Sequence, residues 1–276
     1  MRHFVIALLA GLAALPFATP SFAQDTGPAV PDRRVVITRD VDFFGSDLQS
    51  LFDTSLEACQ KLCLDTPDCQ AFTFNSRSNA CFPKAAVTDR QPYDGAVSAL
   101  VINTGPDVQT RAAERRLDLG FLDARDLERA KTEAAALGAR HTGGQWSPRA
   151  LLEAADNSLA SGNLEDSALW VGTALAQTDD AAHWLRYGQL SARVAEEIQG
   201  ADQRKFRARA FLASINGYLR ADDSDLMIDA LRDMALALDK LDRGREMIPA
   251  LRLAEFYGAR PDVTELLDQA VGKYGF

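Results

Sequence analysis

The cysteines constrain this chain more than any other feature, because all four lie between Cys59 and Cys81 in a sequence of 276 residues. Whatever joins them, disulfides or a metal ion, must therefore build one small unit. Just before them, Thr54 and Glu57 have the spacing of a capping box, in which the Thr54 hydroxyl accepts the Glu57 N–H. The sequence thus predicts a helix over residues 55–64, with the first two cysteines one turn apart on the same face.

Short segments rich in aromatic and β-branched residues surround this helix and predict an antiparallel sheet. The expected strands are residues 34–38, 70–75, 80–82 and 96–102. The polar residues 75–79 predict a hairpin turn between the second and third of these strands. We expect residues 41–51 to form a loop or a short strand, and residues 84–95 to be irregular.

Four cysteines allow three disulfide pairings, and helix geometry favours one of them. Cys63 ends the predicted helix and Cys69 follows its turn, so these two sulfurs can meet locally. Cys59 lies one turn earlier and faces the sheet, where Cys81 can reach it. A Cys59–Cys63 bridge within one helical turn is usually strained by the directions of its Cβ atoms. We therefore predict Cys59–Cys81 and Cys63–Cys69, the longer bridge contributing about 3 kcal/mol to stability.

A four-cysteine zinc site is the alternative interpretation of this cluster. The gaps of three, five and eleven residues between successive cysteines differ from the paired C-x-x-C spacing of most structural zinc sites. The start of the chain also indicates export, and exported proteins favour disulfides over reduced thiols. Both observations favour the two disulfides.

This stretch resembles the PAN/Apple domain family. The residues that carry the resemblance are Asp42–Leu48, Ser55–Cys59, Cys63, Cys69, Ala71–Asn75 and Cys81–Lys84. The resemblance implies an α+β domain over residues 34–103, in which one helix lies on an antiparallel sheet and two disulfides join them in the pairing predicted above. A third bridge, found in some members, is missing here. Members of the family bind proteins or glycans through differing surfaces, so the resemblance implies a protein or glycan ligand.

The beginning of the chain has the features of a secretory signal peptide. Basic residues precede an apolar run over residues 4–17, and Ser21 and Ala23 place small side chains where a signal peptidase reads them. We expect a signal peptide over residues 1–23, cleavage after Ala23, a linker over residues 24–33, and a periplasmic or secreted protein. An uncleaved anchor is the alternative, but the run is shorter than the ~20 residues of a spanning helix. We expect no stable membrane insertion after cleavage.

After residue 103 the composition changes, and helix-forming residues dominate. Residues 104–146 are expected to be a helical connector, with helices over 108–119 and 123–137. Residues 147–276 are expected to be an all-α, repeat-like domain. Its expected helices are 149–159, 164–176, one containing 184–188, 202–219, 225–241, one from Pro249 to Tyr257, and 261–273.

The second half of the chain resembles a short array of tetratricopeptide-like helical hairpins. Pro148 suits the first position of a helix, and a second unit begins at Ala181, one period of about 34 residues later. In that register Trp184, Tyr187 and Gly188 occupy the places that tetratricopeptide repeats give to Trp, Leu and Gly. Ser167, where the family has Ala, departs from the pattern.

The residues give no sign of catalysis, metal binding or a cofactor. His141 and His183 lack partners at the spacing of a metal site or a catalytic triad, and no hydrolase or dinucleotide motif is present. The acidic residues 222–225 lack the Gly and the twelfth-position Glu of an EF-hand, so we expect them to cap the following helix. A net charge of -9 argues against nucleic acid as a partner.

The sequence therefore predicts an exported, non-enzymatic interaction protein with a ligand-binding PAN-like domain and a helical scaffold. The alternative is a part of a protease inhibitor, because leader, PAN-like domain and helical segment follow one another as in the N-terminal region of bacterial alpha-2-macroglobulin-type proteins. This chain has no Cys-x-Glu-Gln thioester motif and no series of sandwich domains. On that interpretation it is a truncated or split-off N-terminal region. A periplasmic enzyme with an unrecognised site is the third hypothesis.

Overall fold

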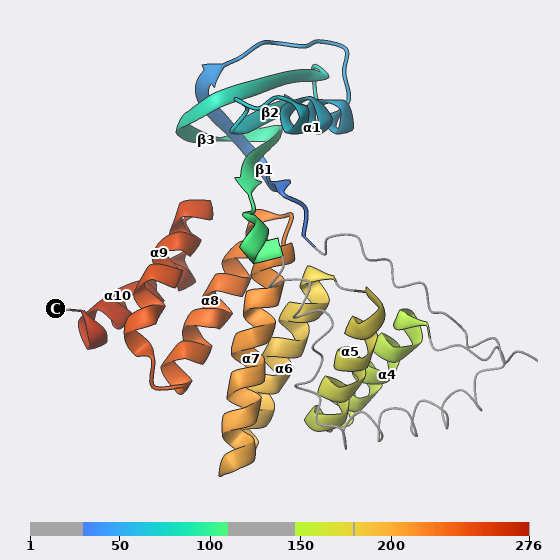
Figure 1. Ribbon diagram of the computed structural model, residues 1–276, viewed down its shortest axis with the longest axis vertical. Coiled ribbons are helices and arrows are strands. Elements are labelled where there is room, and N and C mark those ends of the chain that lie inside the picture. Colours follow the sequence, from blue (N-terminus) through green and yellow to red (C-terminus); the bar gives the residue numbers. More distant parts are fainter. Residues whose placement is uncertain (1–29, 110–146, 179, 276) are drawn as a thin grey trace, which may run out of the picture.

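The computed structural model describes residues 30–109, 147–178 and 180–275. The expected signal peptide, most of the expected linker, residues 110–119 of the first connector helix and all of the second lie outside these residues. The described chain forms a small sheet with one helix, followed by an array of helices. Figure 1 shows the sheet at one end of the array, with β1 and β3 reaching down to the helices.

The sheet has three strands, β1 (Arg33–Asp47), β2 (Ala71–Asn75) and β3 (Ala80–Asn103), in the order β1-β3-β2. Residue numbers rise along β1 and β2 while they fall along their partners in β3, so the pairings run antiparallel. Residues 80–84 and residues 96–100 of β3 both pair with β2, which therefore lies between two parts of the same long strand. This leaves β1 as the outer strand.

The predicted irregular segment over residues 84–95 was wrong, because these residues belong to β3. The predicted loop over 41–51 is likewise strand as far as Asp47. The cause is long-range pairing: β1 lies along β3 from Arg33 opposite Asn103 to Asp47 opposite Lys84. No local pattern encodes a partner so distant in sequence, and Pro92 within the segment argues locally against a strand.

Helix α1 (Leu56–Asp65) lies where the sequence predicted a helix, but its cap is one residue later than expected. Ser55 is the N-cap, and its hydroxyl accepts the N–H of Ala58 at 3.2 Å. The predicted capping box at Thr54 was wrong because the Thr54 N–H donates to the carbonyl of Asn79 at 3.0 Å. That bond holds Thr54 against the β2–β3 turn and outside the helix.

The second half of the described chain forms seven α-helices and one short 3₁₀ turn, η2 (Gly244–Glu246). The helices are α4 (Pro148–Ala160), α5 (Leu164–Thr178), α6 (Ala181–Glu197), α7 (Ala201–Arg220), α8 (Ser224–Lys240), α9 (Met247–Tyr257) and α10 (Pro261–Tyr274). Short connections join consecutive helices, and each packs on the next. This confirms the all-α half of the predicted fold. Beyond Asn103, the described residues contain no strand.

In the helical array, helix starts agree with the sequence patterns, with one exception. Ser147 caps α4 and Pro148 occupies its first turn, as predicted. Pro249 does not begin α9, which starts at Met247 after η2. A proline is tolerated within a first turn because the N–H groups there have no intrahelical acceptor.

Helices α6 and α7 pack closely against each other. Trp184 and Tyr187 are almost fully buried. A Cβ atom at Gly188 would lie 3.2 Å from the Cβ of Ala213 and 3.3 Å from the carbonyl oxygen of Ala210. The absence of a side chain at Gly188 therefore lets α7 approach α6 closely.

Candidate functional site

Two disulfides form the core of the N-terminal domain, in the pairing expected from the sequence. Cys59 is bonded to Cys81 and Cys63 to Cys69, with Cα–Cα distances of 5.6 and 5.3 Å. All four side chains are buried, together with Phe72 of β2. The bridges tie α1 to the loop after it and to β3. All four sulfurs are thereby used, which leaves no thiolate for the zinc interpretation.

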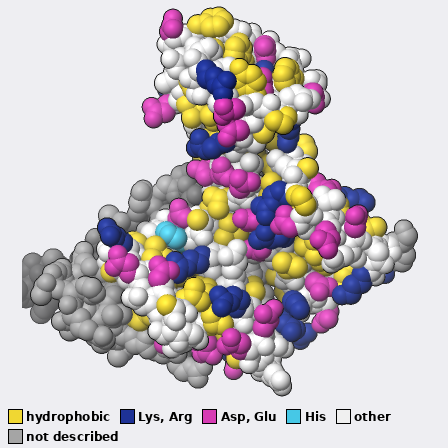
Figure 2. Space-filling model, turned by 180° about the vertical axis from the view of Figure 1, so that it is seen from behind, with side chains coloured by type: hydrophobic (Ala, Val, Ile, Leu, Met, Phe, Trp, Pro, Cys, Tyr) yellow, Lys and Arg dark blue, Asp and Glu magenta, His cyan; other side chains and the backbone are white. Residues whose placement is uncertain are grey.

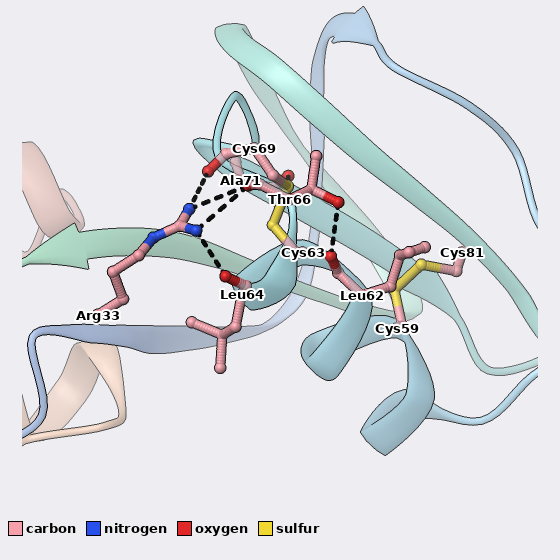
Figure 3. The surroundings of a disulfide bond; sticks show 9 residues. All are labelled: Arg33, Cys59, Leu62, Cys63, Leu64, Thr66, Cys69, Ala71 and Cys81. Carbon is pink, nitrogen blue, oxygen red and sulfur yellow. Dashed lines mark hydrogen bonds between the residues drawn. A yellow bond between two sulfur atoms is a disulfide. The ribbon is translucent and has the colours of Figure 1, made fainter.

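Arg33 completes this core, although sequence reasoning missed it. Its guanidinium donates to the carbonyls of Leu64, Thr66 and Cys69, the last at 3.0 Å (Figure 3). The last carbonyls of a helix have no intrahelical donor and carry the negative end of its dipole. Arg33 therefore caps the C-terminal end of α1 and fixes it beside the Cys63–Cys69 bridge.

Arg34 performs the same task for a helix of the array. Neighbouring residues of a strand point to opposite faces, and the Arg34 guanidinium donates to the carbonyls of Ala221 and, at 3.2 Å, Tyr218. These carbonyls end α7. Burial lowers the pKa of Arg34 below its ordinary value, with nearby Tyr218 opposing that shift.

Arg90 of β3 binds the end of a second helix of the array. It donates to the carbonyl oxygen of Phe256 at 2.7 Å and to that of Tyr257 at 3.4 Å, where α9 ends. Its guanidinium carbon lies 4.8 Å from the ring centroid of Phe43 and 5.2 Å from that of Phe256. Such positions favour cation–π attraction. A cleft of about 690 Å³ opens beside these residues.

A backbone hydrogen bond also joins the two halves. The N–H of Ile37, on the outer strand β1, donates to the carbonyl of Asp222 at 2.7 Å, and Ile37 and Asp223 form an isolated β-bridge. The turn between α7 and α8 thus covers the free edge of the sheet at Ile37. Unprotected sheet edges promote association with other chains, so this contact protects the domain.

The two strands that meet the array bury both of their faces. Val35 belongs to the core of the N-terminal domain, whereas Val36 belongs to the core of the array. In β3, Ala99 and Leu100 divide in the same way. Continuous apolar runs such as these are typical of strands buried on both faces, a signal from which the contact was predictable.

We call this contact the seam: Arg34, Val36, Ile37, Arg90 and Leu100 against residues 218–223 and 256–257.

The segment between β1 and α1, which lies at the end of the domain farthest from the helices (Figure 1), exposes apolar side chains. Phe52 is 68% exposed and Leu48 40%. The Phe52 ring meets the Phe82 ring edge-on at a centroid distance of 6.4 Å, and Lys84 Nζ lies 5.8 Å from the Phe82 ring centroid. Figure 2 shows hydrophobic side chains on the domain's end farthest from the helices. We call Leu48, Phe52 and Phe82 the Phe52 surface; Lys84 lies buried beneath it and pairs with Asp47. Contiguous exposed apolar side chains, rather than scattered ones, mark sites of interaction, and here Phe52 and Phe82 are in contact.

Comparison with known proteins identifies the N-terminal domain. Residues 34–100 match the family described as the PAN domain. They are a PAN domain. A Zea mays protein named as the receptor protein kinase ZmPK1 is 33% identical over 60 residues, which make up 22% of this chain and 7% of that protein. The chain therefore spans a small fraction of that relative's length.

The PAN domain is a non-catalytic module that typically binds protein or carbohydrate. Its two disulfides are consistent with an extracellular protein. In the part of the chain that the structure describes, no group of His, Cys, Asp or Glu could hold a metal ion. Among those residues, no helix has the length and apolarity needed to cross a membrane.

The remaining residues singled out in the sequence have structural partners. Asp223 caps α8 by accepting the N–H of Asp225 at 2.8 Å, as expected for the acidic run. His183 lies in the first turn of α6, where its N–H donates to the capping Asp180 at 3.1 Å. His141 lies outside the described residues.

Proposed function

We propose that this protein is an exported, non-enzymatic binding protein whose PAN domain engages a protein or glycan ligand through the Phe52 surface. The helical array serves as its scaffold and holds the domain at a fixed orientation through the seam. The observation that carries the proposal is the exposure of Phe52 and Leu48 in the segment after β1, which lies at the end of the PAN domain farthest from the helices (Figure 1). A domain docked on helices at one end presents the other end to a ligand.

Export is supported by the leader-like residues 1–23, with cleavage proposed after Ala23, and by the two buried disulfides. Disulfides persist in oxidising compartments and are rare in reducing ones. We propose the domain limits expected from the sequence, a PAN-like domain over 34–103 and a helical domain over 147–276. A binding role without catalysis is supported by the non-catalytic nature of the PAN domain.

The test is a ligand screen with the mature chain on glycan arrays and on arrays of extracellular proteins. The double variant Phe52→Ser/Phe82→Ser should lose binding to every hit by more than about tenfold, because aromatic anchors dominate interface energetics. Tyr93→Ser is the matched control, since Tyr93 is a 43% exposed aromatic residue elsewhere on the same domain. Equal binding by the double variant and the wild type would place the ligand elsewhere and contradict the proposal.

The alternative from the sequence, an N-terminal part of an alpha-2-macroglobulin-type inhibitor, rests on the order of leader, PAN domain and helical segment. It requires a separately encoded body with the thioester. A neighbouring reading frame with a Cys-x-Glu-Gln motif supports this alternative, and a genome without one removes its basis.

A further inference from the structure

The helical array contains a groove of about 490 Å³ that the PAN domain does not touch. One face of each of the helices α6, α7 and α8 lines the groove. From α8 the lining residues are Asp233, Leu236, Ala237 and Lys240, which recur at the three- and four-residue spacing expected for one helical face. The residues between these helices are small, including Gly188. The small residues form the floor of the groove, and longer side chains such as Arg193, Arg207 and Lys240 also line it.

The groove has an exposed apolar residue. Leu236 is 43% exposed although it lies near the C-terminal end of α8, a helix whose other face is buried. Ala192 and Ala195 of α6 face the same hollow. A partner that covers this leucine removes apolar surface from water, which stabilises the complex.

Positively charged side chains outnumber negatively charged ones along the groove. Arg193, Arg207 and Lys240 stand against the carboxylates of Glu196 and Asp233. Asp233 is already compensated. Its side chain is 14% exposed, pairs with Arg232 at 3.0 Å and accepts a hydrogen bond from Gln189 at 2.9 Å.

The cations gather at the end of the array away from the PAN domain. The end of α7 and the start of α8 form the seam, whereas Lys240 ends α8 and Arg207 lies near the start of α7. Arg207 donates to the carbonyl of Lys240 at 3.0 Å, which fixes it at the groove. Among the described residues, Arg193 has no ion-pair partner. Lys240 interacts electrostatically with the neighbouring Asp239, which is itself paired with Lys273 at 3.0 Å. A basic site in a chain of net charge -9 indicates an acidic ligand of limited size.

We propose that this groove binds an extended acidic segment of a partner protein, which covers Leu236 with a small apolar side chain and places carboxylates against Arg193, Arg207 and Lys240. A long polyanion such as a nucleic acid is disfavoured, because the rest of the acidic surface repels it. A short segment with two or three carboxylates contacts the three cations without extending over the acidic surface around them. This site is separate from the Phe52 surface and does not depend on the ligand of the PAN domain.

The experiment selects a displayed library of random dodecapeptides on the immobilised mature chain. Enrichment of peptides with at least two acidic residues is expected, and the best peptide is then labelled for fluorescence anisotropy. Arg193→Glu/Lys240→Glu should weaken its binding by more than about tenfold, and added salt should weaken it further. Arg204→Glu/Arg252→Glu is the matched control, because it makes the same charge change at exposed residues outside the groove.

A third variant, Leu236→Asp, tests the apolar part at an exposed position where folding is not at risk. It should also weaken binding. Selection of peptides without acidic residues, or equal binding by the wild type and the groove variant, overturns the proposal. A concentration-dependent dimer in sedimentation velocity that the groove variant abolishes also overturns it, because the occupant is then a second copy of this chain. The Phe52→Ser/Phe82→Ser variant should bind the peptide normally, which separates this test from that of the PAN ligand.

Discussion

Replacing Arg34 by Met should destabilise the helical array, although Arg34 belongs to the PAN domain. The substitution keeps an apolar stem of similar length and removes the two hydrogen bonds to the carbonyls of Tyr218 and Ala221. It therefore removes the cap from the C-terminal end of α7 and leaves the packing of the strand nearly unchanged.

The magnitude follows from opposing contributions at Arg34. Hydrogen bonds from a charged donor stabilise by about 1.5–3 kcal/mol each, and a cation at a helix C-terminus adds about 0.3–1 kcal/mol. Burying the guanidinium opposes this gain, as its lowered pKa indicates, and its Nε is buried without a partner. The expected net loss for Arg34→Met is about 2–4 kcal/mol in the free energy of unfolding.

Urea unfolding followed by tryptophan fluorescence measures this loss. All three tryptophans, Trp146, Trp170 and Trp184, lie outside the PAN domain, so their fluorescence reports on the rest of the chain. Arg39→Met is the matched control, because Arg39 is an exposed arginine of the same strand. An Arg34→Met midpoint equal to that of Arg39→Met would refute the seam as a stabilising contact.

Three further outcomes are expected. Cys59→Ala/Cys81→Ala should lower the unfolding free energy of the PAN domain by about 2–4 kcal/mol in a thermal melt, because this bridge closes a long loop. Asp262 is held at a pKa of about 2, first by its hydrogen bond from Arg260. Its stabilisation is complete above pH 3.8 and is lost as the pH falls toward 2, so Asp262→Asn should flatten the acid side of a stability–pH curve. Burial, with Tyr218 nearby, raises the pKa of Tyr257 above 10.0. The stabilisation from its neutral phenol is therefore present below pH 10 and declines at higher pH, a decline that Tyr257→Phe should remove in alkaline unfolding experiments.

Local chemistry made part of this fold predictable. The cysteine spacing and the helix geometry were enough for the disulfide pairing, because both bridges join neighbouring segments. Ser147 and Pro148 mark a helix start by side-chain capping and a fixed backbone angle, and α4 begins there. Such signals need no information about distant parts of the chain.

Contacts between distant residues were not predictable in the same way. Arg34 and Ala221 are 187 residues apart, and Arg90 and Phe256 are 166 apart. No sequence motif distinguishes these arginines from exposed ones such as Arg39. The strand over residues 84–92 was missed for the same reason, since its partner is β1. Only the unbroken apolar run around Val35 and Val36 indicated that this strand is buried on both faces.

The seam joins the PAN domain and the helical array into one body. The amide of Ile37 tests it most directly, because this N–H lies on the outer edge of the sheet and donates to Asp222. Residue-resolved hydrogen–deuterium exchange on the mature chain should find the Ile37 amide protected to nearly the degree of amides in the sheet interior. Exchange of this amide at the rate of an exposed strand edge, with the rest of β1 protected, would show that the two halves do not dock.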